Sequence, residues 1–153
     1  MTEPQDTLRK ALFQGVRELE AEDLLLLLPH RPPILMLDRV ISLVPRRHAV
    51  GLKMVTGNEF GLSTKEHGFI FPATLALEAL VQLATVTLRY PEDGVWPEKG
   101  MEDSVFLAGI EQLTVHRELL SGEALQLSVT IQDPDPTPVS VDGQVVLGGE
   151  AYV

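Results

Sequence analysis

The sequence contains no cysteine among its 153 residues. Disulfide bonds, thiolate metal sites and a cysteine nucleophile are therefore excluded. Basic residues are also few, with 12 Lys and Arg against 22 Asp and Glu and a net charge of −10 at pH 7. Because affinity for nucleic acids and anionic membrane surfaces rests largely on Lys and Arg, we expect neither as a partner.

Long apolar runs are missing as well. The longest one, residues 24–28, is far shorter than the roughly 20 residues of a membrane span. The first 20 residues are polar and mixed in charge, unlike a signal peptide, so a cytoplasmic protein is expected. What the sequence does contain is 44% hydrophobic residues, which predicts one globular domain over residues 1–153.

The first part of the chain predicts a helix followed by two strands. Residues 7–28 combine strong helix formers with leucines, so we expect a helical N-terminal segment within residues 1–28. It should end at the prolines that follow, Pro29, Pro32 and Pro33. Residues 34–44 and 48–56 favour strands, and the alternation of the second places on one side Ala49, Gly51, Lys53 and Val55. Residues 57–70 have no period and predict a loop.

Residues 72–89, PATLALEALVQLATVTLR, predict the clearest helix of the chain. Pro72 stands at a permitted first-turn position. The segment is apolar nearly all round, which is typical of a helix surrounded by protein. Within that apolar surface Glu78 and Gln82 lie four positions apart and therefore share a face.

The remaining sequence predicts a loop over residues 90–103, in which Trp96 packs down, and then strands. The strands are expected over residues 104–115, 124–132 and 139–153. The three prolines of residues 133–138 predict a turn. Asp142-Gly143 predicts a hairpin turn, and Gly148-Gly149 predicts a bulge. The order of two strands, one buried helix and further strands predicts an α+β fold, a curved antiparallel sheet wrapped around one long helix.

Three blocks of the sequence resemble a known family. They are LPHRPPILMLDRV (residues 28–40), PATLALEALVQ (72–82) and FLAGIEQLTVHRELLSGEAL (106–125). With these blocks in this order, the chain resembles the 3-hydroxyacyl-[acyl carrier protein] dehydratases, which have the hot-dog fold. The family usually has two long strands at its end, and the chain has room for only one full strand there or a shortened pair.

The resemblance implies a site built from an acid on the central helix and a histidine in the loop before it. The histidine moves the proton alpha to the thioester, the acid handles the 3-hydroxyl or water, and a backbone N–H at the helix start polarises the thioester carbonyl. Glu78 matches the acid, Gln82 would hold it, and Ala73 falls where the family usually has a glycine. Because the two side chains usually come from two subunits, a dimer is implied. From the residues alone, Glu78 is either a proton-transfer group on an apolar helix or a glutamate satisfied by the core.

The histidine has no direct match. Counting back from Glu78 places the family's histidine on Thr64, and counting forward from Asn58 places it on Lys65. Neither a hydroxyl nor an ammonium group exchanges a proton near pH 7 as an imidazole does. The His-Phe-Pro-Gly signature is absent, and His67 in EHGFIFP stands two or three residues late. His67 is thus either a displaced catalytic base or an ordinary loop histidine.

The other histidines suggest structural or surface roles. His30 belongs to the opening block, where we expect a buried, hydrogen-bonded side chain, and His48 and His116 each adjoin arginine on the surface. The four histidines lie far apart in sequence without metal-ligand spacing, so no metal and no cofactor are expected. The candidate catalytic residues are Glu78 and His67, and the candidate substrate-binding residues are Ala73, Gln82, Phe71 and Thr64.

Three functions follow from the resemblance. The first is removal of water from a (3R)-3-hydroxyacyl thioester, the second a non-catalytic acyl-chain binder or partner subunit of an active homologue, and the third thioester hydrolysis. The expected partner is an acyl carrier protein or a coenzyme A thioester, in a homodimer or heterodimer. An acidic carrier would need a basic surface, and the only dense basic patch is Arg46-Arg47-His48, with possible neighbours Lys53, Lys65 and Arg117.

Overall fold

The computed structural model describes residues 18–92, 95–96, 105–135, 137–147 and 150–151. Its helices are α2 (Ala21–Leu27) and α3 (Ala73–Arg89). Its strands are β1 (Arg39–Val44), β2 (His48–Met54), β3 (Ser63–Lys65), β4 (Gly68–Phe71), β5 (Leu119–Leu120), β6 (Ala124–Ile131), β7 (Val141–Leu147) and β8 (Glu150–Ala151).

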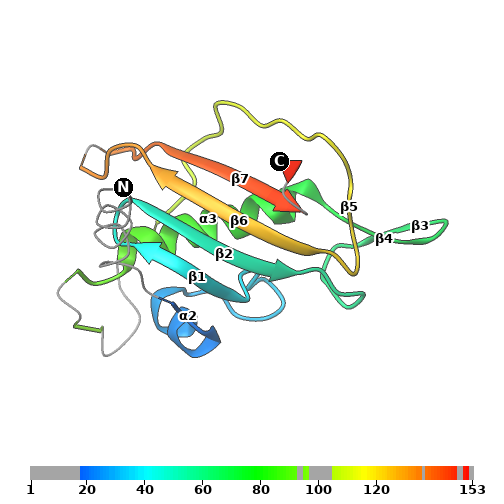
Figure 1. Ribbon diagram of the computed structural model, residues 1–153, viewed down its shortest axis with the longest axis horizontal. Helices are drawn as coiled ribbons and strands as arrows, with labels where there is room; N and C mark the ends of the chain where they lie inside the picture. The colour runs from blue at the N-terminus through cyan, green and yellow to red at the C-terminus, as the bar shows by residue number, and fades with distance from the viewer. Residues whose placement is uncertain (1–17, 93–94, 97–104, 136, 148–149, 152–153) are drawn as a thin grey trace, which may run out of the picture.

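The core lies between one antiparallel sheet and α3. The sheet has five strands in the order β1-β2-β6-β7-β8 and lies across α3 (Figure 1). A second, three-stranded sheet of β3, β4 and β5 continues from the N-terminal end of α3. The predicted α+β architecture, a sheet around one long helix, is confirmed.

The central helix forms where the sequence predicts it, from Ala73 directly after Pro72 to Arg89. Most of its side chains are buried, as its all-round apolarity indicates. The helix approaches β2 closely at Gly51, where an added Cβ would lie 2.7 Å from Leu37 Cδ1 and 3.2 Å from Leu83 Cδ1. Glycine at this position therefore lets the helix layer lie against the sheet.

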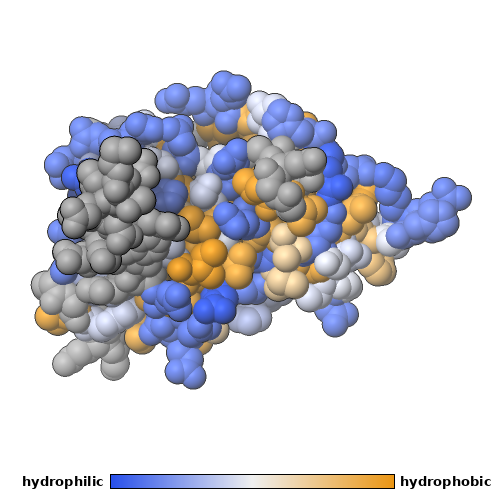
Figure 2. Space-filling view, viewed as in Figure 1, coloured by the Kyte–Doolittle hydropathy of each residue, from blue (hydrophilic) through white to orange (hydrophobic). Residues whose placement is uncertain are grey.

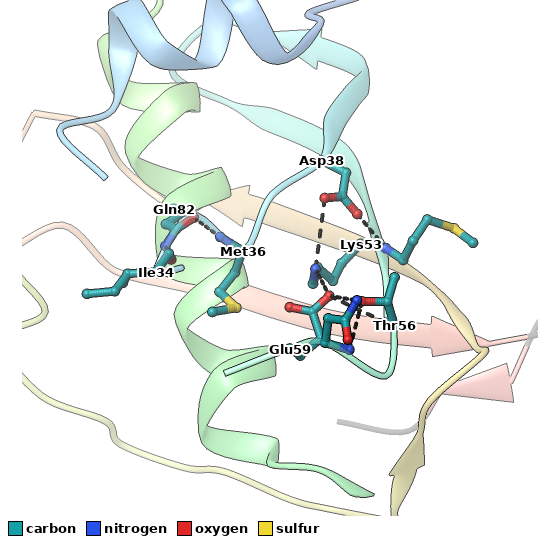
Figure 3. A network of polar contacts seen from close by, with 9 residues as sticks. Ile34, Met36, Asp38, Lys53, Thr56, Glu59 and Gln82 are labelled. Carbon is teal, nitrogen blue, oxygen red and sulfur yellow. Dashed lines mark hydrogen bonds and ion pairs between the residues drawn. The ribbon is translucent and has the colours of Figure 1, made fainter. Parts of the chain in front are cut away.

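Strand β2 confirms the predicted alternation, with Ala49, Gly51 and Lys53 buried on the helix side. Lys53 is charged and yet 4% exposed, and it lies between two acids. Its Nζ donates to Glu59 Oε1 at 2.7 Å and lies 3.9 Å from Asp38 Oδ1 (Figure 3). The ion pair fixes the loop after β2 to the sheet.

The N-terminal predictions need two corrections. The helix expected over residues 7–28 falls partly on residues 1–17, outside the described residues, and of its described part only α2 is helical. Residues 18–20 are extended, because Leu19 pairs with Val40 and Glu20 caps α2 in a capping box with Asp23. The strand expected over residues 34–44 begins only at Arg39.

The prediction of a loop over residues 57–70 is also wrong in part, because β3 and β4 form a hairpin that projects from the body (Figure 1). Its residues are almost all exposed, so burial imposes no alternation that the sequence could reveal.

In the C-terminal part, β6 confirms the strand predicted over residues 124–132. No strand forms over the described residues 105–118, which run along the β7 side of the sheet (Figure 1). Asp142-Gly143 is not a turn but lies inside β7, opposite Thr130 and Val129. An added Cβ at Gly143 would lie 3.1 Å from Leu80 Cδ1 of α3, so a larger residue there requires a small shift of the Leu80 side chain. The bulge predicted at Gly148-Gly149 lies outside the described residues.

Figure 2 looks onto the outer face of the sheet and shows apolar side chains gathered in its middle, with hydrophilic ones around them. Trp96 packs edge-on against Tyr90, with ring centroids 5.5 Å apart, as expected for the loop after α3. Among the described residues, no helix is long and apolar enough to cross a membrane.

Candidate functional site

Glu78 lies on α3 with a side chain that is 34% exposed. The next residue, Ala79, is fully buried, and so is Gln82, one turn further along the helix. Gln82 Nε2 donates to Glu78 Oε1 at 2.9 Å. The shared face predicted for these two residues is confirmed, and it places a held carboxylate at the surface of an otherwise buried helix.

Gln82 also fixes the chain segment before β1. Its Oε1 accepts from the Met36 N–H at 2.9 Å, and its Nε2 donates to the Ile34 carbonyl oxygen at 2.8 Å (Figure 3). These two contacts decide which way the amide points, so the second N–H of Nε2 must face Glu78. Residues 34–36 are therefore held by α3 instead of extending β1.

His30 is the residue that the sequence interpretation placed wrongly. Its Nε2 lies 3.3 Å from Glu78 Oε1, and its side chain is 27% exposed. Its Nδ1 is buried without a hydrogen-bond partner among the described residues. The prediction of a buried, hydrogen-bonded His30 is therefore wrong. The histidine is partly exposed, and its imidazole lies beside Glu78 of α3, 48 positions away in the sequence.

Two further candidates, Ala73 and Phe71, lie at and just before the start of α3. Ala73 is the first helical residue, no side chain caps this end, and the N–H groups of a first turn have no partner inside the helix. Its amide is thus placed to meet an anionic oxygen. Phe71 ends β4 and is 1% exposed, so it belongs to the core of this chain.

His67 and Thr64 lie on the β3–β4 hairpin, away from Glu78 of the same chain. His67 is exposed in the two-residue turn, and Thr64 is exposed on β3 opposite Phe69. Lys65 forms an ion pair with Glu118. The roles of His67, Thr64, Phe71 and Ala73 toward a substrate stay predictions.

Two of the possible neighbours of the basic patch Arg46-Arg47-His48 do not join it. Lys53 is buried with Glu59, and Lys65 lies on the hairpin, at the opposite end of the molecule from the Arg46 turn (Figure 1). Arg46 itself donates to the Pro134 carbonyl oxygen at 2.9 Å. In the described part of the chain, no three His, Asp or Glu side chains gather as a metal site would require.

The sequence and the fold were compared with known proteins. A scan against models of protein families gives no match. The 3-hydroxyacyl-[acyl-carrier-protein] dehydratase FabZ of Herpetosiphon aurantiacus is 35% identical over 139 residues, which cover 86% of this chain and 94% of that protein. The FabZ of Anaeromyxobacter sp. is 36% identical over 135 residues, covering 81% and 82%.

Among solved structures, a chain of the dehydratase heterocomplex ApeI:P from Xenorhabdus doucetiae matches with a TM-score of 0.68 at 17% identity, covering 84% of each chain. This likeness confirms the predicted hot-dog fold.

Proposed function

Because this chain belongs to the family of 3-hydroxyacyl-[acyl-carrier-protein] dehydratases, we propose that it binds a 3-hydroxyacyl thioester and removes water from it, with Glu78 as the acid. The observation that carries the proposal is the placement of the Glu78 carboxylate. It is held by Gln82, open on one side, and adjacent to an imidazole.

The geometry around Glu78 suits the loss of a hydroxyl group. One carboxylate oxygen, Oε1, accepts from Gln82 and lies 3.3 Å from His30 Nε2, whereas no hydrogen bond joins Oε2 to the described residues. A protonated carboxyl here can donate its proton to the 3-hydroxyl, which leaves as water. The free first-turn amide of Ala73 lies five residues earlier, about 7.5 Å along the helix axis. That spacing leaves room for the thioester carbonyl beyond the reacting carbons.

A second candidate is a non-catalytic partner subunit, as the sequence interpretation also holds. It is favoured by the exposed position of His67 and by Thr64 and Lys65 at the positions where the family has its histidine. The matching structure named a dehydratase heterocomplex supports the idea that such folds also act in unlike pairs.

Dimer formation is part of either proposal. The segment 105–118 exposes a series of large apolar side chains, of which Phe106 is the most open at 81%. Its other members are Val105, Leu107, Ile110, Leu113 and Val115. An extended segment with such side chains beside the end of a sheet is a surface that a second chain would cover.

The experiment is a turnover assay with a (3R)-3-hydroxyacyl group carried on acyl carrier protein or on coenzyme A. Enoyl formation, water addition to the enoyl product, and free thiol release are followed separately. We expect enoyl formation by the wild type and a loss of at least about 100-fold in Glu78→Gln. Thiol release without enoyl would show thioester hydrolysis instead. Wild-type protein that binds the thioester without turnover on either carrier would favour the partner-subunit role.

A further inference from the structure

Residue His30 is the imidazole closest to Glu78 in the described part of the chain. It comes from the connection between α2 and β1, whereas Glu78 comes from the middle of α3. The 3.3 Å between Nε2 and Oε1 brings the two groups within proton-transfer reach, and both side chains are partly exposed. A small substrate approaching from outside would meet both groups together.

The imidazole is held from its backbone. The Arg31 guanidinium donates to the carbonyl oxygens of Leu25 at 3.0 Å, Leu28 at 2.8 Å and His30 at 2.7 Å. These contacts fasten the His30 peptide to the C-terminal end of α2. Because Nδ1 is buried and has no hydrogen-bond partner among the described residues, Nε2 is the ring nitrogen that is available to Glu78 and to a substrate.

No other side chain in the described part of the chain fills this role. The hairpin positions Thr64 and Lys65 carry no imidazole, and Lys65 is paired with Glu118. His67 lies in the exposed hairpin turn, and it would have to reach the Glu78 of a second copy. We propose that His30 is the base of this enzyme and that His30 and Glu78 of the same chain form its proton-transfer pair. The inference rests on the dehydration proposed above.

The step balances within the pair. The C2–H bond of the 3-hydroxyacyl thioester breaks, its proton goes to Nε2 of His30, and its electron pair forms the C2=C3 bond. The C3–O bond breaks, and the leaving hydroxyl takes the carboxyl proton of Glu78 and departs as water. The imidazolium and carboxylate then lie side by side. Passage of the proton from Nε2 to the Glu78 carboxylate restores the neutral imidazole and the protonated carboxyl group without help from another residue.

A purely structural His30 that only steadies Glu78 is the alternative, and the choice of variants separates the two. His30→Gln keeps a donor toward Glu78 but cannot accept the C2 proton. His30→Ala opens a space that added imidazole can enter. His67→Gln tests the displaced loop histidine, and His116→Gln, at an exposed position, is the matched control.

The test measures enoyl formation by these four variants, with folding checked by circular dichroism. We expect a fall of at least about 100-fold in His30→Gln and His30→Ala. Added imidazole should restore part of the rate in His30→Ala only, and the control His116→Gln should keep the wild-type rate. Near-wild-type turnover by His30→Gln, or a loss in His67→Gln alone, would overturn the inference and leave the proposed function standing. An inactive wild type would overturn both.

If the His30 variants do not fold, wild-type protein treated with diethyl pyrocarbonate answers the same question. Activity should then decline in step with the modification of His30, mapped by mass spectrometry. Activity that persists after His30 is fully modified would overturn the inference.

Discussion

Replacing Gln82 by methionine removes the three hydrogen bonds of its amide and keeps the length of the side chain. The Met36 N–H, which is buried, then loses its acceptor, at a cost of about 1–3 kcal/mol. The Ile34 carbonyl loses a donor too, but Ile34 is 52% exposed and water can replace that contact. For a domain of this size we expect the melting temperature to fall by roughly 3–10 °C.

The same change should reduce turnover. Glu78 loses the donor at 2.9 Å that orients it, and a hydrogen bond to a charged group contributes about 1.5–3 kcal/mol. If half of that is realised in the transition state, the rate falls by roughly 4- to 13-fold. The control is Gln112→Met, because Gln112 is exposed and its amide donates to Thr114 Oγ1 at 3.4 Å, on the surface. Thermal melts and enoyl formation are measured on both. A Gln82→Met protein that melts within about 1 °C of wild type would refute the reasoning.

Other parts of the molecule give further predictions. Lys53→Met leaves the Glu59 carboxylate, which is 13% exposed, without its cation, so stability in urea should fall by about 3 kcal/mol. The double variant with Glu59→Gln should recover part of that loss, and equal stability of the single and double variants would contradict the coupling. Gly51→Val should destabilise by about 2–3 kcal/mol, since its Cβ would lie 2.7 Å from Leu37 Cδ1; an unchanged unfolding midpoint would count against this packing. Ile110→Asp should convert a wild-type dimer to monomer in sedimentation, and a wild type that is already monomeric would argue against an interface there.

The sequence predicted the structure correctly where one face of an element is buried, because burial then requires apolar side chains at regular intervals. The central helix, the alternation of β2 and the pairing of Glu78 with Gln82 all follow from side chains that must face a core. The sequence-based prediction failed where an element is exposed and burial places no requirement on its side chains. The β3–β4 hairpin is exposed on both faces, so its residues show no alternation. Asp142-Gly143 resembles a hairpin turn in sequence, but both residues pair with β6 inside β7, and Gly143 lies close to Leu80 of α3.

The site was predicted in part for a similar reason. Glu78 and Gln82 are local partners on one helix, and their spacing alone reveals the contact. His30 reaches Glu78 only through the connection after α2, and no local pattern indicates a contact across 48 positions. The sequence signal for His30 was indirect: the histidine stands in the block of residues 28–40, among prolines that fix the backbone around it. Arg31, the next residue, fixes the position of His30 by binding carbonyl oxygens at the end of α2. The contact of His30 with Glu78 becomes visible only in the folded structure.

The most direct test of the account is the rate of enoyl formation from a (3R)-3-hydroxyacyl thioester by wild-type protein and by Glu78→Gln at equal concentration. The substitution keeps the shape of the side chain and its contact with Gln82, and removes only the transferable proton. The account predicts steady turnover by the wild type and a fall of at least about 100-fold in the variant. Equal rates for the two proteins would contradict the assignment of Glu78 as the acid of the reaction.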